Sequence, residues 1–315
     1  MKRRRKPLRY LAVILLILLA FCLAAYPFIS NWWVENSADS VVAALDATTE
    51  KTDTEELSAE IEAAREYNEA LAGVRVNLTD PFDASAMGDG NPEYESLLCM
   101  TEDGIMGYIQ IPSINVNLPI FHGTSGTVLE QGAGHLEGTS LPVGGESTHT
   151  VLTGHTGLSS AKLFTDLTEL AEGDIFFLNV FGERMAYKVG QITVVEPDDL
   201  DSLYIVDGKD YCTLVTCTPY GINSHRLLVR GERTDYEEAV SDENTYKPKE
   251  QTSTWMQEYR ESLYISLAVF LFFLLLYLLI RKLRNRKEKG EQAQTEKQGG
   301  ENSNSPPQQG EKEEL

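Results

Sequence analysis

Two long apolar runs, one near each end of the chain, constrain the fold more than any other feature of the sequence. The first covers residues 10–30 after a basic segment, 1–9, and the second covers 262–280 before another basic cluster. Each is as long as the ~17 to 25 residues that cross a bilayer as a helix. Because basic clusters stay in the cytoplasm, we expect a two-pass cell-membrane protein with both termini cytoplasmic and an extracellular domain between the spans. A cleaved signal peptide is the alternative for the first run, since Ala24 and Ala25 are small residues near a plausible cleavage site.

The charge of the chain is unevenly distributed. Residues 10–280 hold 13 Lys and Arg against 41 Asp and Glu, a net charge of −28. A domain of this charge repels polyanions, so we expect no nucleic acid partner. Solubility in an ionic extracellular environment explains the acidity more simply than a dedicated calcium site.

The cysteine count argues against a disulfide framework. Of the four cysteines, Cys22 lies inside the first apolar run, which leaves Cys99, Cys212 and Cys217 outside the membrane. Three cysteines cannot all pair within one chain, so we expect at least one free thiol. We interpret Cys99 and Cys212 as small buried apolar residues.

Composition divides the rest of the chain into segments of distinct character. A helix start is indicated by Thr52 and Glu55, which are spaced as in a capping box, and turn residues are dense after Asn77. We expect membrane-proximal helices over 31–76, a loop and connection over 77–100, the main domain over 101–234, a polar linker over 235–261 and a disordered cytoplasmic tail over 281–315.

Short runs rich in β-forming residues recur through the main domain. They cover 108–111, 115–120, 148–153, 175–180 and 185–196, with two more around Cys217, and a short helix is expected near 158–170. Regularly spaced short strands predict a mainly β domain, either a barrel or a sandwich.

A nucleophile, a cation and a base occur at the ends of these runs. Cys217 ends the run 211–216, a turn with Pro219 and Gly221 follows, and Arg226 begins the next run, so the thiol and the guanidinium should lie at adjacent strand ends. His155 follows another β run within Gly-His-Thr-Gly, where glycine permits a tight turn around the imidazole.

These segments resemble the sortase family of cysteine transpeptidases. That family has a histidine after a Leu-Thr-Gly run and a Thr-Leu-x-Thr-Cys strand followed nine residues later by arginine; this chain reads Leu-Thr-Gly-His at 152–155 and Thr-Leu-Val-Thr-Cys at 213–217. Further segments follow in the family's order from Gly107 to Leu167, so the resemblance covers roughly 101–232. It implies a sortase-like closed β-barrel with His155, Cys217 and Arg226 as the catalytic triad.

The chemistry of such a triad is nucleophilic catalysis. A thiolate attacks a carbonyl better than a thiol does, and a neighbouring imidazolium and guanidinium would stabilise it. His225, beside Arg226, is the competing base, but strand alternation directs it to the opposite face. Three other histidines have no metal-ligand spacing, so we expect structural roles for His122, His135 and His149.

No cofactor is expected, because the sequence has no HExxH, paired CxxC, phosphate loop or nucleotide fingerprint. The resemblance implies a substrate with a Leu-Pro-x-Thr-Gly sorting signal. It also implies cleavage after Thr through a Cys thioester, which an amine then resolves.

Two features resemble the class C, pilin-polymerising sortases. One is the second apolar run, and the other is Asp80-Pro81-Phe82, similar to the Asp-Pro-aromatic motif of the lid in that class. The resemblance implies that the lid, which we define as 79–87, pairs Asp80 with Arg226 and lays Phe82 over Cys217. Phe82 stands where Trp is commoner, and a plain turn is the alternative.

We therefore expect a membrane-anchored class C sortase that transfers the acyl group of an LPxTG-type pilin to a pilin lysine. A sortase that anchors surface proteins to a peptidoglycan precursor is the alternative enzyme. A catalytically silent membrane-anchored binding scaffold is the alternative of another class, and the complete triad argues against it.

Overall fold

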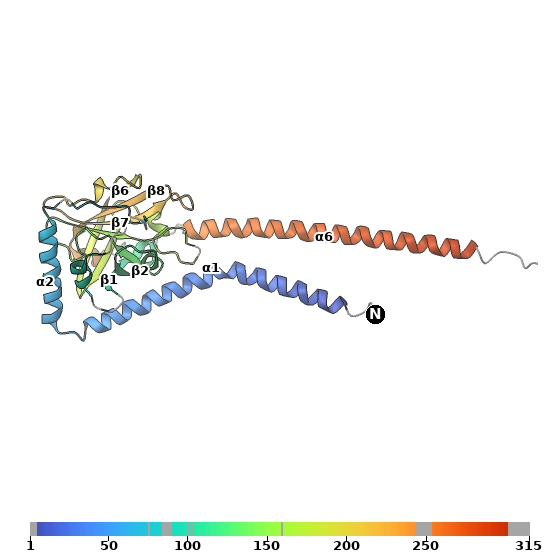
Figure 1. Cartoon of the computed structure of the whole chain (residues 1–315), viewed down its shortest axis with the longest axis horizontal. Helices are drawn as coiled ribbons and strands as arrows, with labels where there is room; N and C mark the ends of the chain where they lie inside the picture. Colours follow the sequence, from blue (N-terminus) through green and yellow to red (C-terminus); the bar gives the residue numbers. More distant parts are fainter. Residues whose placement is uncertain are drawn as a thin grey trace, which may run out of the picture. The chain divides into compact units, whose positions relative to one another are not determined.

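The computed structural model describes residues 5–74, 76–83, 90–99, 101, 104–158, 160–242 and 254–301. It divides into two compact units, Met1–Gln257 and Glu258–Leu315. The first contains the β domain and the N-terminal helices, and the second contains most of a long C-terminal helix (Figure 1).

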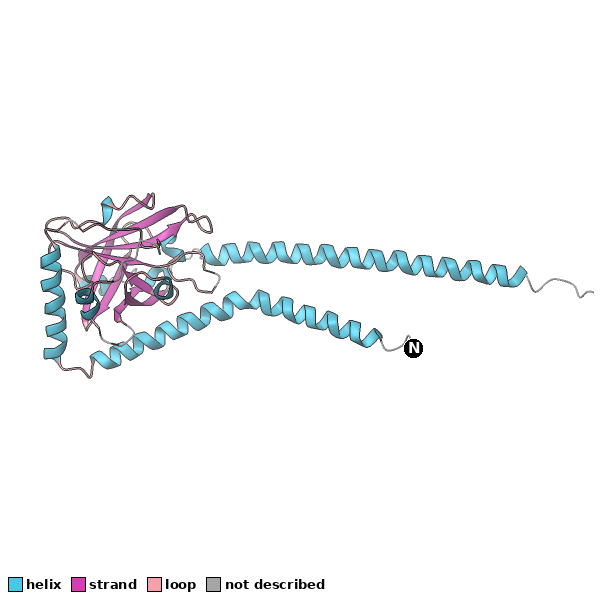
Figure 2. Ribbon diagram, in the orientation of Figure 1, coloured by secondary structure: helices cyan, strands magenta, loops and turns pink. Residues whose placement is uncertain are grey.

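The first unit is built on a closed β-barrel, one of the two architectures that the short β runs predicted (Figure 2). The strand order around the barrel is β1-β2-β3-β4-β7-β8-β6-β5, and β1 pairs with β5 to close it. Most neighbours are antiparallel, whereas β3 runs parallel to β2 and β7 runs parallel to β4. The strands are β1 Ile105–Ile111, β2 Val116–His122, β3 Ala133–His135, β4 Thr148–Thr153, β5 Ile175–Val180, β6 Glu183–Val195, β7 Asp210–Thr218 and β8 His225–Thr234.

Aliphatic side chains on the inner faces of the strands fill the barrel. Ile109, Ile120, Leu152, Leu214 and Val229 come from five different strands and are all fully buried. Burial of a side chain of this size contributes about 1.5 to 3 kcal/mol relative to exposure. Because side chains fill the interior of the barrel, we expect a functional site at the strand ends rather than inside.

A second apolar cluster covers the outer face of β4, β7 and β8. Val151, Val215 and Leu228 point outward from these strands and are buried against Leu78, with Phe82 packed at the margin. The chain after residue 77 is therefore held against the strands that carry Cys217 and Arg226.

The short helices lie in the connections: α3 Pro92–Ser96, η1 Pro112–Ile114, α4 Gly126–Leu129, η2 Thr165–Glu169, η3 Asp201–Leu203 and α5 Tyr236–Ser241. The helix expected near 158–170 is only η2, a 3₁₀ turn, because Gly157 has φ +74° and the chain from there folds back toward β4. The strand β3 was not expected, since its Ala-Gly-His sequence lacks β-branched residues. Of the two cysteines expected to be small buried residues, Cys212 is buried but Cys99 is exposed, so the expectation for Cys99 was wrong.

Two long helices precede α3 and the barrel, α1 Arg5–Thr49 and α2 Thr54–Leu71. The first is one continuous helix that is bent partway along, and it contains Pro27, which removes a backbone hydrogen bond (Figure 1). Ala38, Val42 and Leu45 on its C-terminal half are buried, so α1 braces the barrel. The second helix is capped by Asp53, which accepts a hydrogen bond from the backbone N–H of Glu55, rather than by the expected Thr52.

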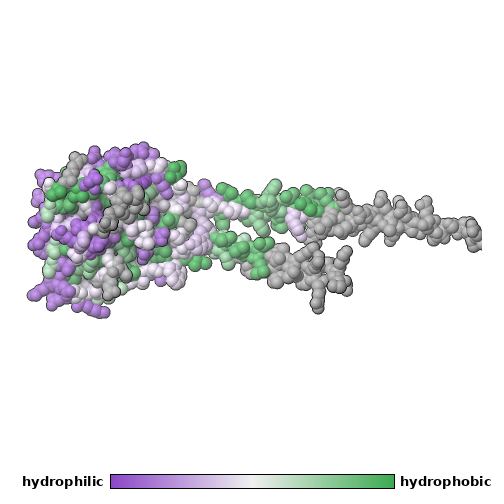
Figure 3. Space-filling view, viewed as in Figure 1, coloured by the Kyte–Doolittle hydropathy of each residue, from purple (hydrophilic) through white to green (hydrophobic). Residues whose placement is uncertain are grey.

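Two segments are long and apolar enough to cross a membrane, Leu15–Thr49 within α1 and Tyr259–Ile280 within α6 Thr254–Glu301. The exposed large apolar side chains of these segments lie between Leu15 and Trp33 in α1 and between Leu263 and Ile280 in α6, and green surfaces mark these apolar stretches in Figure 3. Helix α6 continues through 281–301, where a disordered tail was expected, because this stretch is rich in Lys, Arg, Glu and Gln, which favour helix. The rest of the expected tail, 302–315, lies outside the described residues.

A buried amide joins α2 to the barrel and gives a test of the fold. The Nδ2 of Asn68 donates to the carbonyl oxygen of Leu141 at 3.0 Å, and the Oδ1 accepts from the N–H of Leu141 at 2.7 Å. Asn68→Ala should lower the free energy of unfolding by about 1 to 3 kcal/mol, because it leaves a buried N–H unpaired. Denaturant unfolding in detergent measures the change, and Glu69→Ala on the exposed side of the same turn is the control. Equal stability of the two variants would contradict this role.

Candidate active site

The thiol and the guanidinium predicted from the sequence do meet at adjacent strand ends. Cys217, near the end of β7, lies directly opposite Arg226, near the start of β8, in the antiparallel ladder. Directly opposed residues share a face of the sheet. Both are buried, with only 7% of each residue exposed.

The loop after β4 brings His155 to the same end of the barrel. The N–H of Gly154 donates to the carbonyl oxygen of Val215 at 3.1 Å, and the Thr216 hydroxyl donates to the carbonyl oxygen of Gly154 at 2.7 Å. A Cβ at position 154 would lie 2.6 Å from the ring of Phe164, so only glycine fits there. His155 is thereby held next to the last residues of β7.

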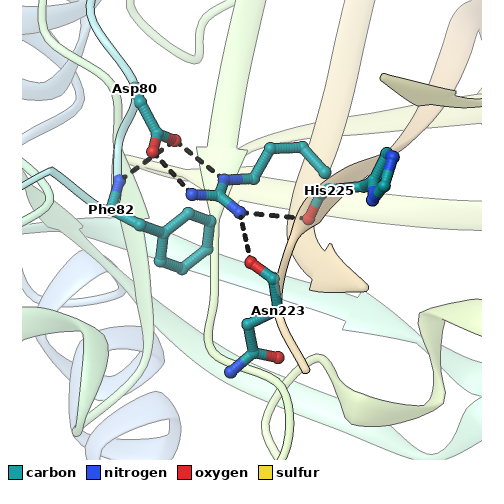
Figure 4. A network of polar contacts seen from close by, with 5 residues as sticks. Asp80, Phe82, Asn223 and His225 are labelled. Carbon is teal, nitrogen blue, oxygen red and sulfur yellow. Dashed lines mark hydrogen bonds and ion pairs between the residues drawn. The ribbon is translucent and has the colours of Figure 1, made fainter. Parts of the chain in front are cut away.

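The carboxylate of Asp80 binds the guanidinium of Arg226. The Nε and Nη2 of Arg226 donate to Oδ1 and Oδ2 of Asp80 at 2.9 and 2.6 Å, a two-point contact, and Nη1 donates to the backbone carbonyls of Asn223 and His225 (Figure 4). The side chains of Arg226 and Asp80 are only 9% and 15% exposed. The expected pairing of Asp80 with Arg226 is confirmed.

Phe82 completes the cover over this end of the barrel. Its ring lies 5.0 Å from Cζ of Arg226 and 5.6 Å from the ring of His155, so it contacts the cation and the imidazole. A turn sets its position, because Asp80 accepts hydrogen bonds from the N–H groups of Phe82 and Asp83. The expected lid is described from Thr79 to Asp83, and 84–87 lie outside the described residues.

Burial disfavours the charged forms of both candidate catalysts in this arrangement. Burial raises the pKa of Cys217 to about 11; the charge of Arg226 opposes this shift and that of Asp80 adds to it. Burial also lowers the pKa of His155, against the opposing charge of Glu130. With Asp80 in place, burial therefore favours a thiol and a neutral imidazole over the thiolate and imidazolium expected from the sequence.

The rings of the four other histidines each have contacts of their own, away from the thiol of Cys217 and the guanidinium of Arg226. The ring of His225 is turned away from the guanidinium in Figure 4, and its Nε2 lies 3.2 Å from a carboxylate oxygen of Glu196. His135 and His149 are hydrogen-bonded in the interior, where burial lowers the pKa of each to about 4. His122 lies between the carbonyl oxygens of Gly104 and Leu97. Among the described residues no three His, Cys, Asp or Glu side chains group as metal ligands.

Sequence reasoning missed the backbone carbonyl of Asn223 and the hydroxyl of Thr216, which fix Arg226 and the His155 loop. Asn223 has φ +59°, a conformation that Asn tolerates better than most residues, and it follows the Pro-Tyr-Gly-Ile turn. That turn signal could have identified a constrained segment, but nothing in the sequence indicated which carbonyls face the guanidinium.

Comparison with known proteins identifies the family. Residues 109–234 match the sortase domain. The structure resembles that of sortase C from Streptococcus pneumoniae, with 45% sequence identity and a TM-score of 0.57 over 62% of this chain and 97% of that chain. The chain belongs to the sortase family. The expected sortase-like closed barrel is confirmed with it.

Two further sortases show how far the similarity extends. Sortase C-1 from Actinomyces oris is 50% identical, with a TM-score of 0.54 over 57% of this chain and 99% of that chain. Sortase A of Streptococcus agalactiae serotype III (strain NEM316) is 32% identical over 131 residues, 41% of this chain and 52% of its own length. The match thus spans about half of this curated sortase A, whereas the sortase C proteins from Streptococcus pneumoniae and Actinomyces oris are covered almost in full.

The position of Asp80 makes the reactivity of Cys217 testable. Asp80→Ala with Phe82→Ala removes an anion and a hydrophobic cover, so the pKa of Cys217 should fall. Alkylation at pH 8 should then accelerate roughly tenfold or more, since the thiolate fraction rises tenfold for each unit that the pKa falls. Alkylation rate against pH measures this, and the curve should move to lower pH.

Two controls isolate the effect. All variants carry replacements of the other three cysteines, Cys22, Cys99 and Cys212. Glu183→Ala breaks an ion pair with Arg65 elsewhere on the surface and should leave the curve unchanged. Overlapping curves for the double variant and the parent would show that Asp80 and Phe82 do not control the thiol.

Proposed function

We propose that the chain is a class C sortase in which Cys217 is the nucleophile, His155 the acid–base and Arg226 the oxyanion-stabilising cation. The observation that carries this proposal is the ladder pairing of Cys217 with Arg226, with the His155 loop hydrogen-bonded to the same strand. A silent scaffold would not require all three groups at one strand end.

The first half of the proposed reaction forms a thioester. His155 accepts the thiol proton, and the sulfur attacks the carbonyl carbon of Thr in a Leu-Pro-x-Thr-Gly segment. The oxyanion of the tetrahedral intermediate receives hydrogen bonds from Arg226 and from a backbone N–H near Cys217. His155 then protonates the amine of Gly, the C–N bond breaks and the acyl group remains on sulfur.

The second half transfers the acyl group. An amine attacks the thioester carbonyl, His155 accepts its proton, and the C–S bond breaks to restore the thiol. We propose a pilin lysine as the acceptor, because the similar sortase C structure from Streptococcus pneumoniae is described in connection with pilin substrate specificity. Transfer to a peptidoglycan precursor is the alternative, and we retain it because the chain is also similar to a sortase A.

We further propose that the segment 79–87 acts as a lid. Asp80 takes up the Nε and Nη2 donors of Arg226 that an oxyanion would need, and its charge helps to keep Cys217 protonated. Substrate binding therefore requires Asp80 to leave the guanidinium.

The catalytic assignment predicts the behaviour of four variants. Cys217→Ala should form no acyl adduct with a Leu-Pro-x-Thr-Gly peptide, as measured by intact mass. His155→Ala and Arg226→Ala should lower turnover by roughly 10²-fold or more, because each removes proton transfer or charge stabilisation. His225→Ala should retain turnover, since that ring faces Glu196.

Product analysis separates the alternatives. Cleavage with hydroxylamine as acceptor excludes a scaffold, and comparison of a pilin lysine with a peptidoglycan-like amine identifies the acceptor. Near-normal turnover of His155→Ala would contradict the triad.

We propose that both candidate spans cross the cell membrane, with the barrel outside and both termini in the cytoplasm. The basic clusters 1–9 and 281–287 support this topology. A tag placed after Leu315 should therefore resist protease in intact protoplasts and be digested after permeabilisation. Digestion in sealed protoplasts would place that end outside.

A further inference from the structure

Helix α1 reaches the barrel at the point where its apolar run ends. Residues 10–30 form that run, and the next residue, Asn31, accepts a hydrogen bond at its Oδ1 from the backbone N–H of Lys162 at 2.7 Å. Since a helix rises 1.5 Å per residue, this contact lies within a few ångströms of the end of the run. The headgroup region on each side of a bilayer is about 5 to 8 Å deep. A contact at Asn31 therefore falls inside that region if α1 spans the membrane.

The loop held by Asn31 is the one that carries His155. The ammonium of Lys162 donates to the carbonyl oxygen of Ile114 and pairs with Asp166, both at 2.7 Å, and only 15% of the Lys162 side chain is exposed. The N–H of Phe164 closes the loop by donating to the carbonyl oxygen of His155. A segment fixed at so many points transmits the position of α1 to the catalytic end of the barrel.

Large apolar side chains are exposed at the same end. Trp32 and Trp33 follow Asn31 on α1 and are 61% and 67% exposed. Ile222, in the turn between β7 and β8, is 71% exposed. This turn adjoins the His155 loop, because a Cβ on Gly157 would lie 3.7 Å from the backbone nitrogen of Gly221.

We propose that the end of the barrel that carries Cys217 is seated on the outer surface of the membrane, with Trp32, Trp33 and Ile222 in the lipid interface. Tryptophan is enriched at this depth because its ring is amphipathic. We assign lipid to this surface because the exposed Trp32 and Trp33 follow directly on the apolar run 10–30 of α1. The inference rests on the membrane topology of the proposed function and deepens it: a site at this depth favours a peptide that is itself held at the membrane.

Strand β7 supplies a matched pair of probe positions. Ile222 follows its C-terminal end, and Val206, 42% exposed, precedes its N-terminal end. Nine residues of strand separate the two ends by about 30 Å. Seating of one end should place Ile222, but not Val206, within reach of lipid.

Quenching of tryptophan fluorescence by brominated lipid tests the seating. The full chain, with its three tryptophans, Trp32, Trp33 and Trp255, replaced by Phe, carries either Ile222→Trp or Val206→Trp and is reconstituted into phosphatidylcholine vesicles with bromines at a shallow acyl position. The emission of I222W should fall at least ~2-fold, as for an interfacial ring, and that of V206W should stay near its value without bromine.

The remaining outcomes decide against the proposal in distinguishable ways. A chain that fails to float with the vesicles would overturn both the seating and the membrane topology. If the chain floats but the emission of I222W is not quenched, the seating is wrong and the membrane topology stands. The turn between β7 and β8 would then face solvent or a protein partner. If V206W is quenched instead, the opposite end of the barrel lies against the membrane, which contradicts the proposal. Cleavage of a sorting-signal peptide by I222W shows that the exposed substitution preserves the site.

Discussion

The antiparallel pairing of β7 with β8 determines the rest of the candidate site. It sets Cys217 opposite Arg226, and a slip of one residue would move one of them to the other face of the sheet. The closed barrel prevents such a slip, because β7 is also paired with β4 from Asp210 to Val215, and β8 is paired with β6. The same β4 pairing brings the His155 loop to the end of β7, so the positions of all three groups depend on one set of registers.

Burial fixes the positions of the candidate catalytic side chains but disfavours the charged forms that the proposed reaction uses. It orders Cys217 and His155 but disfavours the thiolate and the imidazolium, and Asp80 adds to the effect on the thiol. An exposed ion pair contributes only about 0 to 1 kcal/mol, whereas breaking a buried pair by removing one partner is much costlier. The Asp80–Arg226 pair is mostly buried, but movement of the proposed lid would return Asp80 to water, so the cost of separation would fall between these limits. Under the proposed function, that intermediate value would give a resting enzyme with a protected thiol and an accessible open state.

The sequence predicted seven of the eight strands and the meeting of Cys217 with Arg226, because alternating β runs and turn residues are local signals. The pairing of Asp80 with Arg226 came from resemblance to the family and could not have come from spacing across 146 residues. Strand β3 was missed because its pairing with β2 and β4, not its composition, makes it a strand. The exposure of Cys99 and the contact of Phe82 with His155 depend on how distant segments pack, which no local pattern records.

The attachment of the proposed lid limits how it could open. Asn68 fixes the end of α2 to the barrel, and Leu78 is buried against Val215 and Leu228, so the chain is held both well before and just before Asp80. Release of Leu78 would expose a side chain whose burial contributes about 1.5 to 3 kcal/mol. Movement of Asp80 and Phe82 alone, pivoting after Leu78, avoids that cost and still frees the guanidinium of Arg226. The least costly opening therefore keeps the outer cluster intact and uncovers only the catalytic end of β7 and β8.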